Sequence, residues 1–180
     1  MKRLIKNSIF IFSYLALFSL YLLYGCSEEA FITDYEPSKD DSLSWYKKIA
    51  ITAVHNHASM LGNLLKDIYT EQDKIVLVRK SIDSVRFYDD KSGYFYVYNF
   101  SCVNIAHATQ KNLQDSNLYN HTDIKGNFVV RLLSEAAQKG GGFVEFYWIK
   151  PGTTGEKKKL GYVEPIPNTN YFIGTGVYME

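Results

Sequence analysis

The strongest strand signal in this chain is the stretch Gly93-Tyr94-Phe95-Tyr96-Val97-Tyr98-Asn99-Phe100. Aromatic and β-branched residues dominate it, and both kinds are enriched in β-strands. Because successive side chains of a strand point to opposite faces, Tyr94, Tyr96 and Tyr98 share one face. The stretch therefore predicts a strand that carries three phenolic hydroxyls on a single side.

Four further strands are predicted from similar composition, at residues 103–107, 143–149, 159–165 and 171–178. Turn-forming residues separate the last three strands, at 151–155 and 167–170. The stretch 110–126 is polar and rich in asparagine, which is typical of a loop. These strands and turns favour an antiparallel sheet.

A long helix is predicted before the strands, over residues 41–70. Apolar side chains recur there three or four positions apart, for example at Trp45, Ile49, Leu61 and Leu64, and no proline interrupts them. So long a helix in a small domain should pack along a sheet or pair with a partner.

Two shorter helices complete the prediction. Residues 73–86 carry a second apolar stripe. Residues 128–139 form an inserted helix, with Asn127 as its cap and the glycines at 140–142 as its end. We therefore expect an α+β fold, in which a long N-terminal helix packs on a five-stranded antiparallel sheet with one inserted helix.

Length and charge limit the alternatives. The chain has 180 residues, of which 46% are hydrophobic and 22% charged, and its formal net charge is +1. Such a length suits one ordinary domain, and the apolar fraction is too high for a disordered chain. The small net charge argues against a nucleic-acid-binding protein.

The first 25 residues have the layout of a secretory signal peptide. Three basic residues precede a short apolar run, which ends in Leu23-Tyr24-Gly25-Cys26. This ending resembles the lipobox of bacterial lipoproteins, so Cys26 is predicted to be lipidated; the alternative is an uncleaved membrane anchor. Residues 26–40 would form a polar tether and 41–180 the domain, on a protein exported to the cell envelope or periplasm.

Neither catalysis nor a cofactor is predicted. With Cys26 lipidated, Cys102 stands alone, so neither an intrachain disulfide nor a paired-cysteine metal site can form. His55 and His57, two positions apart on a helix, point to nearly opposite sides and cannot chelate one ion together. No nucleophile elbow or paired carboxylates are evident, so an enzyme is not expected.

Four stretches of this sequence resemble the single Cache domains of bacterial extracytoplasmic sensors. They are residues 93–98, Asn104-Ile105-Ala106-His107, residues 140–148 from the triple glycine to Trp148, and residues 159–163 together with Ile173-Gly174-Thr175-Gly176-Val177-Tyr178. The family's fold is a PAS-like antiparallel sheet behind a long N-terminal helix. The family usually has Asp at position 99, Gly at 102 and Pro at 108, where this chain has Asn99, Cys102 and Ala108.

The resemblance implies a receptor site for a small organic molecule, with a short carboxylate as the expected ligand. Such a ligand needs a cation and hydrogen-bond donors inside an otherwise apolar cavity. The candidates at the motif positions are Tyr94, Tyr96, His107, Tyr147, Lys159 and Tyr162.

Each candidate also has a structural interpretation. Lys159 is the favoured cation, but residues 157–159 are all lysine and could form a solvated hairpin edge. His107 could be a hydrogen-bonded core histidine, and the tyrosines could simply pack in the sheet. Arg131 is a weaker candidate cation, because it flanks the apolar stripe of its helix.

We thus expect a lipid-anchored sensor domain that binds a short carboxylate and passes the signal to a membrane receptor or kinase partner. The alternative is a structural or interaction lipoprotein of the envelope without a small-molecule ligand. In either case, the long N-terminal helix could mediate a homodimer.

Overall fold

A computed structural model describes residues 39–179. The predicted signal peptide, the lipidated Cys26 and the tether up to residue 38 lie outside the described residues. The helices are α2 (Lys39–Leu65), α3 (Glu71–Ile82), the short 3-10 helix η1 (Lys111–Leu113) and α4 (Val129–Gln138). The strands are β1 (Tyr96–Asn99), β2 (Asn104–His107), β3 (Gly142–Ile149), β4 (Glu156–Pro165) and β5 (Tyr171–Tyr178).

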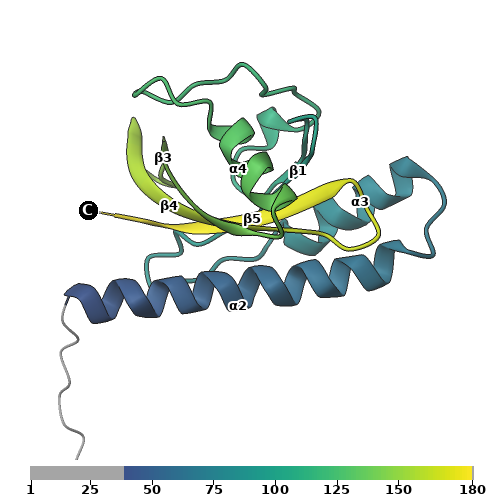
Figure 1. Cartoon of the computed structure of the whole chain (residues 1–180), viewed down its shortest axis with the longest axis horizontal. Helices are drawn as coiled ribbons and strands as arrows, with labels where there is room; N and C mark the ends of the chain where they lie inside the picture. The colour runs from purple at the N-terminus through teal and green to yellow at the C-terminus, as the bar shows by residue number, and fades with distance from the viewer. Residues whose placement is uncertain (1–38, 180) are drawn as a thin grey trace, which may run out of the picture. The chain divides into compact units, whose positions relative to one another are not determined.

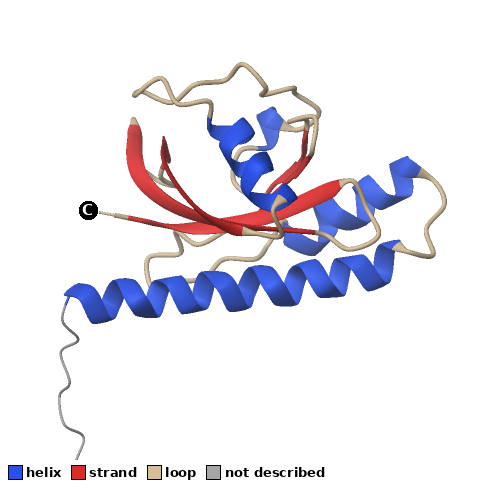
Figure 2. Ribbon diagram, in the orientation of Figure 1, coloured by secondary structure: helices blue, strands red, loops and turns tan. Residues whose placement is uncertain are grey.

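The five strands form one antiparallel sheet in the order β2-β1-β5-β4-β3. The C-terminal strand β5 is therefore central, between β1 and β4. The helix α2 runs along one face of the sheet, and α4 covers β3 and β4 on the other (Figures 1 and 2). This architecture confirms the predicted α+β fold, in which a long N-terminal helix packs on a five-stranded antiparallel sheet with one inserted helix.

The helix α2 packs on the sheet through small and branched side chains, which let its backbone come close. Its buried residues, spaced three or four apart, are Ala50, Val54, Ala58, Leu61 and Leu65. Two residues of the predicted stripe are exposed instead, Trp45 at 62% and Leu64 at 49%. The stripe prediction was wrong there, because alanines occupy much of the core face and the larger apolar side chains lie outside it. Among residues 39–179, no helix has the length and apolarity needed to cross a bilayer.

The inserted helix α4 begins differently from the prediction. Its N-cap residue is Phe128, which makes no side-chain capping bond. The side chain of Asn127 instead donates to Oδ2 of Asp123 at 3.0 Å, within the preceding loop. The helix ends as predicted, since Gly140 has a φ of 98°, a left-handed conformation that suits glycine.

The turn between β1 and β2 tolerates the residues in which this chain departs from the Cache motif. Oδ1 of Asn99 accepts hydrogen bonds from the backbone N–H groups of Ser101 (3.0 Å) and Val103 (2.9 Å), as an aspartate would. Cys102 is buried with a φ of 64°, in the left-handed region that glycine adopts without cost. Cys102 therefore holds a backbone conformation that costs a residue other than glycine some strain.

Candidate ligand-binding site

A small cavity lies between α4 and the face of the sheet that α4 covers. Its polar or aromatic lining residues are Tyr94, Tyr96, Tyr98, His107, Trp148 and Lys159, and its apolar ones are Val129, Leu133 and Phe146. The cavity volume is about 10 Å³, which is close to the space that one water molecule needs. Any ligand larger than water must therefore move part of this lining outward.

Lys159 carries a buried ammonium group at one end of the cavity. Its side chain is 1% exposed. The Nζ atom lies 4.0 Å from the ring centroid of Tyr94, 4.8 Å from that of Tyr178 and 5.5 Å from that of Tyr96. Such contacts stabilise a cation through the negative faces of the rings. The strand pairing explains the cage, because Lys159 on β4 lies opposite Tyr178 on β5.

Among the described residues, no acidic side chain balances this charge. Within residues 39–179, the Lys159 ammonium has neither an ion pair nor a hydrogen bond, and no aspartate or glutamate lines the cavity. Burial alone lowers the pKa of Lys159 to about 7. The ring faces act in the opposite direction, because they favour the charged form of the amine.

This burial predicts an unusual dependence of stability on pH. In the unfolded chain Lys159 keeps its proton up to about pH 10.4, whereas in the folded domain it loses the proton near pH 7. Between these two pH values the unfolded state binds more protons than the folded state. The free energy of unfolding should therefore rise with pH, by up to about 1.4 kcal/mol per pH unit. Urea unfolding between pH 6.5 and 9 measures this rise; a flat or falling profile would show that the ammonium is solvated.

His107 presents a hydrogen-bond donor to the same cavity. Its Nδ1 accepts from the backbone N–H of Gln110 at 3.0 Å and faces the hydroxyl of Thr109 at 3.4 Å. The proton of the neutral ring must therefore reside on Nε2. Burial, followed by the positive charges of Lys159 and Arg86, lowers the pKa of His107 to about 3. His107 is thus a neutral donor, rather than the imidazolium that would bind an anion more strongly.

The tyrosine hydroxyls are largely used within the protein. The Tyr178 hydroxyl donates to the carbonyl oxygen of Ile149 at 2.7 Å, so the Tyr94 hydroxyl donates to Tyr178 at 3.1 Å. The Tyr96 hydroxyl donates to the carbonyl oxygen of Thr175 at 3.3 Å. Burial raises the pKa of each of these phenols above its usual value, so all stay neutral. Tyr94 and Tyr96 therefore line the cavity, while their hydroxyl hydrogens are used in hydrogen bonds within the protein.

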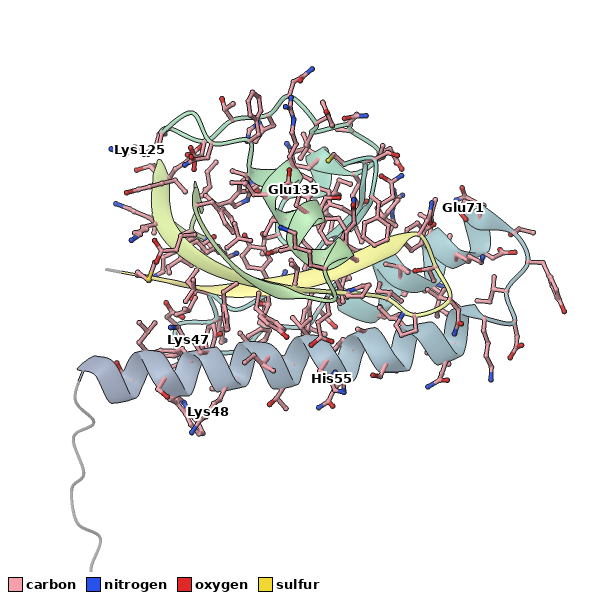
Figure 3. The ribbon with its side chains drawn as sticks, in the orientation of Figure 1. Lys47, Lys48, His55, Glu71, Lys125 and Glu135 are labelled. Carbon is pink, nitrogen blue, oxygen red and sulfur yellow. The ribbon has the colours of Figure 1, made fainter. Side chains whose placement is uncertain are left out.

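The structure does not bring Tyr147 into the cavity. Its neighbours Phe146 and Trp148 line the cavity, so the alternation along β3 points Tyr147 to the other face. Its ring lies 5.8 Å from Nζ of Lys125, a loop residue labelled in Figure 3. The prediction identified the correct strand but the wrong side of it.

Tyr162 also lies outside the cavity. Its hydroxyl donates to Oε1 of Glu164 at 2.8 Å, and its ring contacts that of Phe143 at 4.8 Å. The residue before it, Gly161, is the one on the cavity side, where an added Cβ would meet Phe146 at 2.6 Å. A period-two pattern defines two faces, but it does not say which face holds the site.

The sequence analysis missed two cavity residues, Tyr98 and Trp148, and one ring of the Lys159 cage, Tyr178. Tyr98 had a usable signal, because it shares the face of Tyr94 and Tyr96. Trp148 had the same kind of signal, once the cavity side of β3 was known. Tyr178 had no local signal, because only the pairing of β4 with β5 places it against Lys159.

Arg131 holds the loop that precedes α4. Its Nε donates to the carbonyl oxygen of Tyr119 at 2.6 Å, and its Nη2 donates to Oδ1 of Asn120 at 2.7 Å. The guanidinium also stacks on the Tyr119 ring at 3.9 Å. These contacts direct Arg131 toward the loop, and it is not a lining residue of the cavity.

Asp123 ties the same loop to β3, and nothing in the sequence identified it. Its Oδ1 accepts from the backbone N–H groups of Lys125 and Asn127, both at 2.9 Å. Its Oδ2 accepts from the backbone N–H of Tyr147 and from the Asn127 side chain, both at 3.0 Å. These hydrogen bonds outweigh burial and lower the pKa of Asp123.

The two histidines of α2 have separate roles. Nδ1 of His55 pairs with Oε2 of Glu164 at 3.1 Å. The His57 ring contacts the Phe95 ring at 4.1 Å between centroids, with the two planes tilted by 37°. Among the described residues, no cluster of three or more metal-ligating side chains occurs.

Comparison with known proteins identifies the family. Residues 29–180 match the Cache domain family. The chain belongs to this family. As a Cache domain it is a ligand-binding sensor domain and not an enzyme, and Cache domains of this type are extracytoplasmic.

A curated relative of this Cache domain is the sensor histidine kinase MctS of Rhizobium johnstonii. It is 36% identical over 90 residues, which cover 50% of this chain and 20% of the kinase. The chain spans about a fifth of the length of the curated relatives it matches, 20% and 17% for two of them. The similarity thus concerns a sensor region of larger signalling proteins.

Solved structures agree with this assignment. A methyl-accepting chemotaxis protein from Vibrio parahaemolyticus has a TM-score of 0.60 and 30% identity, covering 78% of this chain and 88% of that one. A Cache chemosensory domain whose structure explains carboxylic acid recognition has a TM-score of 0.68 and 23% identity, covering 80% and 100%. At 23% identity, the similarity to the second structure shows that the two domains share a fold.

Proposed function

We propose that this Cache domain binds a short organic carboxylate between Lys159 and His107. The observation that carries the proposal is the buried Lys159 ammonium, which has no acidic partner among the described residues. A buried charge of this kind costs free energy unless an opposite charge joins it. A carboxylate would supply that charge and accept the Nε2–H of His107 with its second oxygen.

The rest of the cavity suits a short alkyl chain. Val129 and Leu133 of α4 and Phe146 of β3 offer apolar contacts and no further hydrogen-bonding groups. Because the cavity holds only about 10 Å³, small acids require the least movement of α4 and its loop. The solved chemosensory domain that recognises carboxylic acids shares the fold of this chain. The choice of a carboxylate for this cavity rests on Lys159 and His107.

A thermal-shift screen of the purified protein against short carboxylates, amino acids, amines and purines tests the ligand class. A ligand at 100 times its Kd should stabilise the fold by about 2.7 kcal/mol, a shift of several degrees. We expect carboxylates to give the shift. His107→Phe keeps a ring but removes the donor, and should weaken binding about tenfold or more.

The matched control is His121→Phe. His121 contacts Trp148 edge-on at 5.2 Å but does not line the cavity, so binding should be unchanged. A screen without any carboxylate hit on folded protein would contradict the proposed function. Equal affinity of His107→Phe and the wild type would exclude His107 from the site.

We further propose that the domain is tethered to the envelope by a lipid on Cys26 and residues 26–40. The basic segment, apolar run and Cys26 of the N-terminal sequence support this anchor. The relationship to a sensor kinase and to chemoreceptors supports a membrane receptor or kinase as the recipient of the signal. The ligand would then bias the contact between this domain and that partner.

Exposed apolar side chains of α2 support a second proposal, a homodimer of this chain. They are Trp45 at 62%, Met60 at 42% and Leu64 at 49%. Figure 3 shows Lys48 pointing away from the sheet and Lys47 on the sheet side, where its Nζ lies 5.8 Å from the ring of Phe143. Exposed side chains of this size on a long helix are typical of an interaction surface.

Leu64→Asp should therefore convert a dimer into a monomer and leave ligand binding intact. Sedimentation velocity at several protein concentrations measures the change. Ser44→Asp adds the same charge at an exposed polar position of α2 and should not alter assembly. A wild-type protein that stays monomeric at high concentration would contradict the dimer, and the exposed apolar side chains of α2 would then be open to a different partner.

A further inference from the structure

In the part of the chain that the structure describes, the surroundings of the Lys159 amine contain no group that could compensate a change in its charge. Three tyrosine rings enclose the Nζ atom at 4.0–5.5 Å from their centroids. The carboxylates of the neighbouring strands point elsewhere: Glu145 pairs with Lys158 at 2.9 Å, and Glu164 accepts from Tyr162. The protonation of this amine therefore depends on what else enters the cavity.

The other titratable or charged groups near the amine keep one charge state between about pH 5.5 and 9. Tyr94, Tyr96 and Tyr98 come from β1 and the residues before it, and His107 comes from β2. Tyr178 lies on β5, and Arg86 lies in the segment after α3. The phenols have raised pKa values and stay neutral. His107, whose pKa is about 3, is neutral too, and arginine is always charged. The cavity residues contributed by β3 and α4, namely Phe146, Trp148, Val129 and Leu133, do not titrate.

We infer that carboxylate binding in this cavity is coupled to the uptake of a proton by Lys159, so that the affinity for the ligand falls as the pH rises above neutrality. This inference rests on the proposed function, since it requires a carboxylate at the site. The net step takes one carboxylate anion and up to one proton from solution and forms an ammonium–carboxylate pair, without making or breaking covalent bonds elsewhere. The domain would thus respond to the concentration of its ligand and to acidity together.

The size of the effect follows from linkage. With a pKa of about 7 in the free domain, Lys159 is about half protonated at pH 7, and a bound anion next to it favours the charged form. Binding should take up about half a proton at pH 7 and nearly one at pH 8.5. Above neutrality the affinity should fall by up to about tenfold per pH unit.

Isothermal titration calorimetry of the full chain with acetate, propionate and butyrate tests the inference. The titrations are done at pH 7 and 8.5, in phosphate and in Tris. Because the two buffers differ in their heat of ionisation, the difference in observed binding heat gives the number of protons taken up. We expect uptake that increases with pH, together with the loss of affinity. Lys158→Arg, at the exposed neighbouring lysine, should behave like the wild type.

Lys159→Arg provides the decisive variant, because a guanidinium cannot release its proton in this range. It should bind with little dependence on pH and without proton uptake. If it does not fold, NMR titration of the Lys159 side chain in the wild type replaces it, with an expected rise of its pKa on adding the acid. Binding without proton uptake would overturn the inference and leave the proposed function standing, whereas no binding of any acid between pH 5.5 and 8.5 would overturn both.

Discussion

Replacing Lys159 by methionine is expected to abolish carboxylate binding and, at the same time, to stabilise the ligand-free domain. The two effects have one cause. Lys159 is 1% exposed and has no acidic partner among the described residues, so its ammonium destabilises the empty fold and attracts an anion. Methionine is unbranched and fills a similar space without the charge.

Both the loss of affinity and the gain in stability are expected to be large. Losing a buried charge-pair partner typically costs about 2–5 kcal/mol, which corresponds to a loss of affinity of more than about thirtyfold. Removing an uncompensated ammonium should raise the free energy of unfolding by about 1–3 kcal/mol at pH 6. Calorimetry and urea unfolding at the same pH measure the two quantities.

Lys158→Met is the matched control, since Lys158 is exposed and pairs with Glu145 at 2.9 Å. It should change neither the affinity nor the stability by much, because surface ion pairs contribute little. If Lys159→Met were less stable than the wild type and still bound carboxylates, the ammonium would be part of the structural core and not of a ligand site.

Asp123→Ala is expected to destabilise the domain by about 2–4 kcal/mol and to loosen the loop that precedes α4. The carboxylate accepts four hydrogen bonds, which join the loop at Lys125 and Asn127 to β3 at Tyr147. Without it, three backbone N–H groups lose their acceptor. Because α4 follows this loop directly, ligand dissociation should become faster.

Urea unfolding and stopped-flow ligand dissociation measure these effects, with Asp115→Asn as the control. Asp115 is another loop aspartate, its side chain is 70% exposed, and its ion pair with Arg79 at 2.7 Å should contribute about 1 kcal/mol or less. Asparagine suits the left-handed backbone at this position, where φ is 67°. Since hydrogen bonding lowers the pKa of Asp123, its contribution is present at neutral pH and is lost as the pH falls below about 4. Equal stability of the two variants would show that Asp123 does not anchor the loop.

Much of the fold was predictable because its signals are local. The last strand was predicted at 171–178 and occurs at Tyr171–Tyr178, since alternation and flanking turns depend on neighbours in sequence. The predicted apolar stripe of α2 was partly wrong, because burial on this helix depends on contacts with residues far away in the sequence. Alanine is the strongest helix former and has little apolar surface, so it gives a weak signal of burial in the sequence. Only contact with the sheet shows that Ala50 and Ala58 face the core.

Local signals along the chain give the order of helices and strands, the resemblance to Cache domains and four candidate ligand groups, Tyr94, Tyr96, His107 and Lys159. Which of these groups lie together depends on the folded arrangement of the strands. Residues 157–159 are three identical lysines, yet Lys158 pairs with Glu145 in solvent and Lys159 is enclosed by tyrosine rings. The physical reason is that the pairing of β4 with its neighbours sets the face of each side chain, and this register depends on residues far apart in the chain.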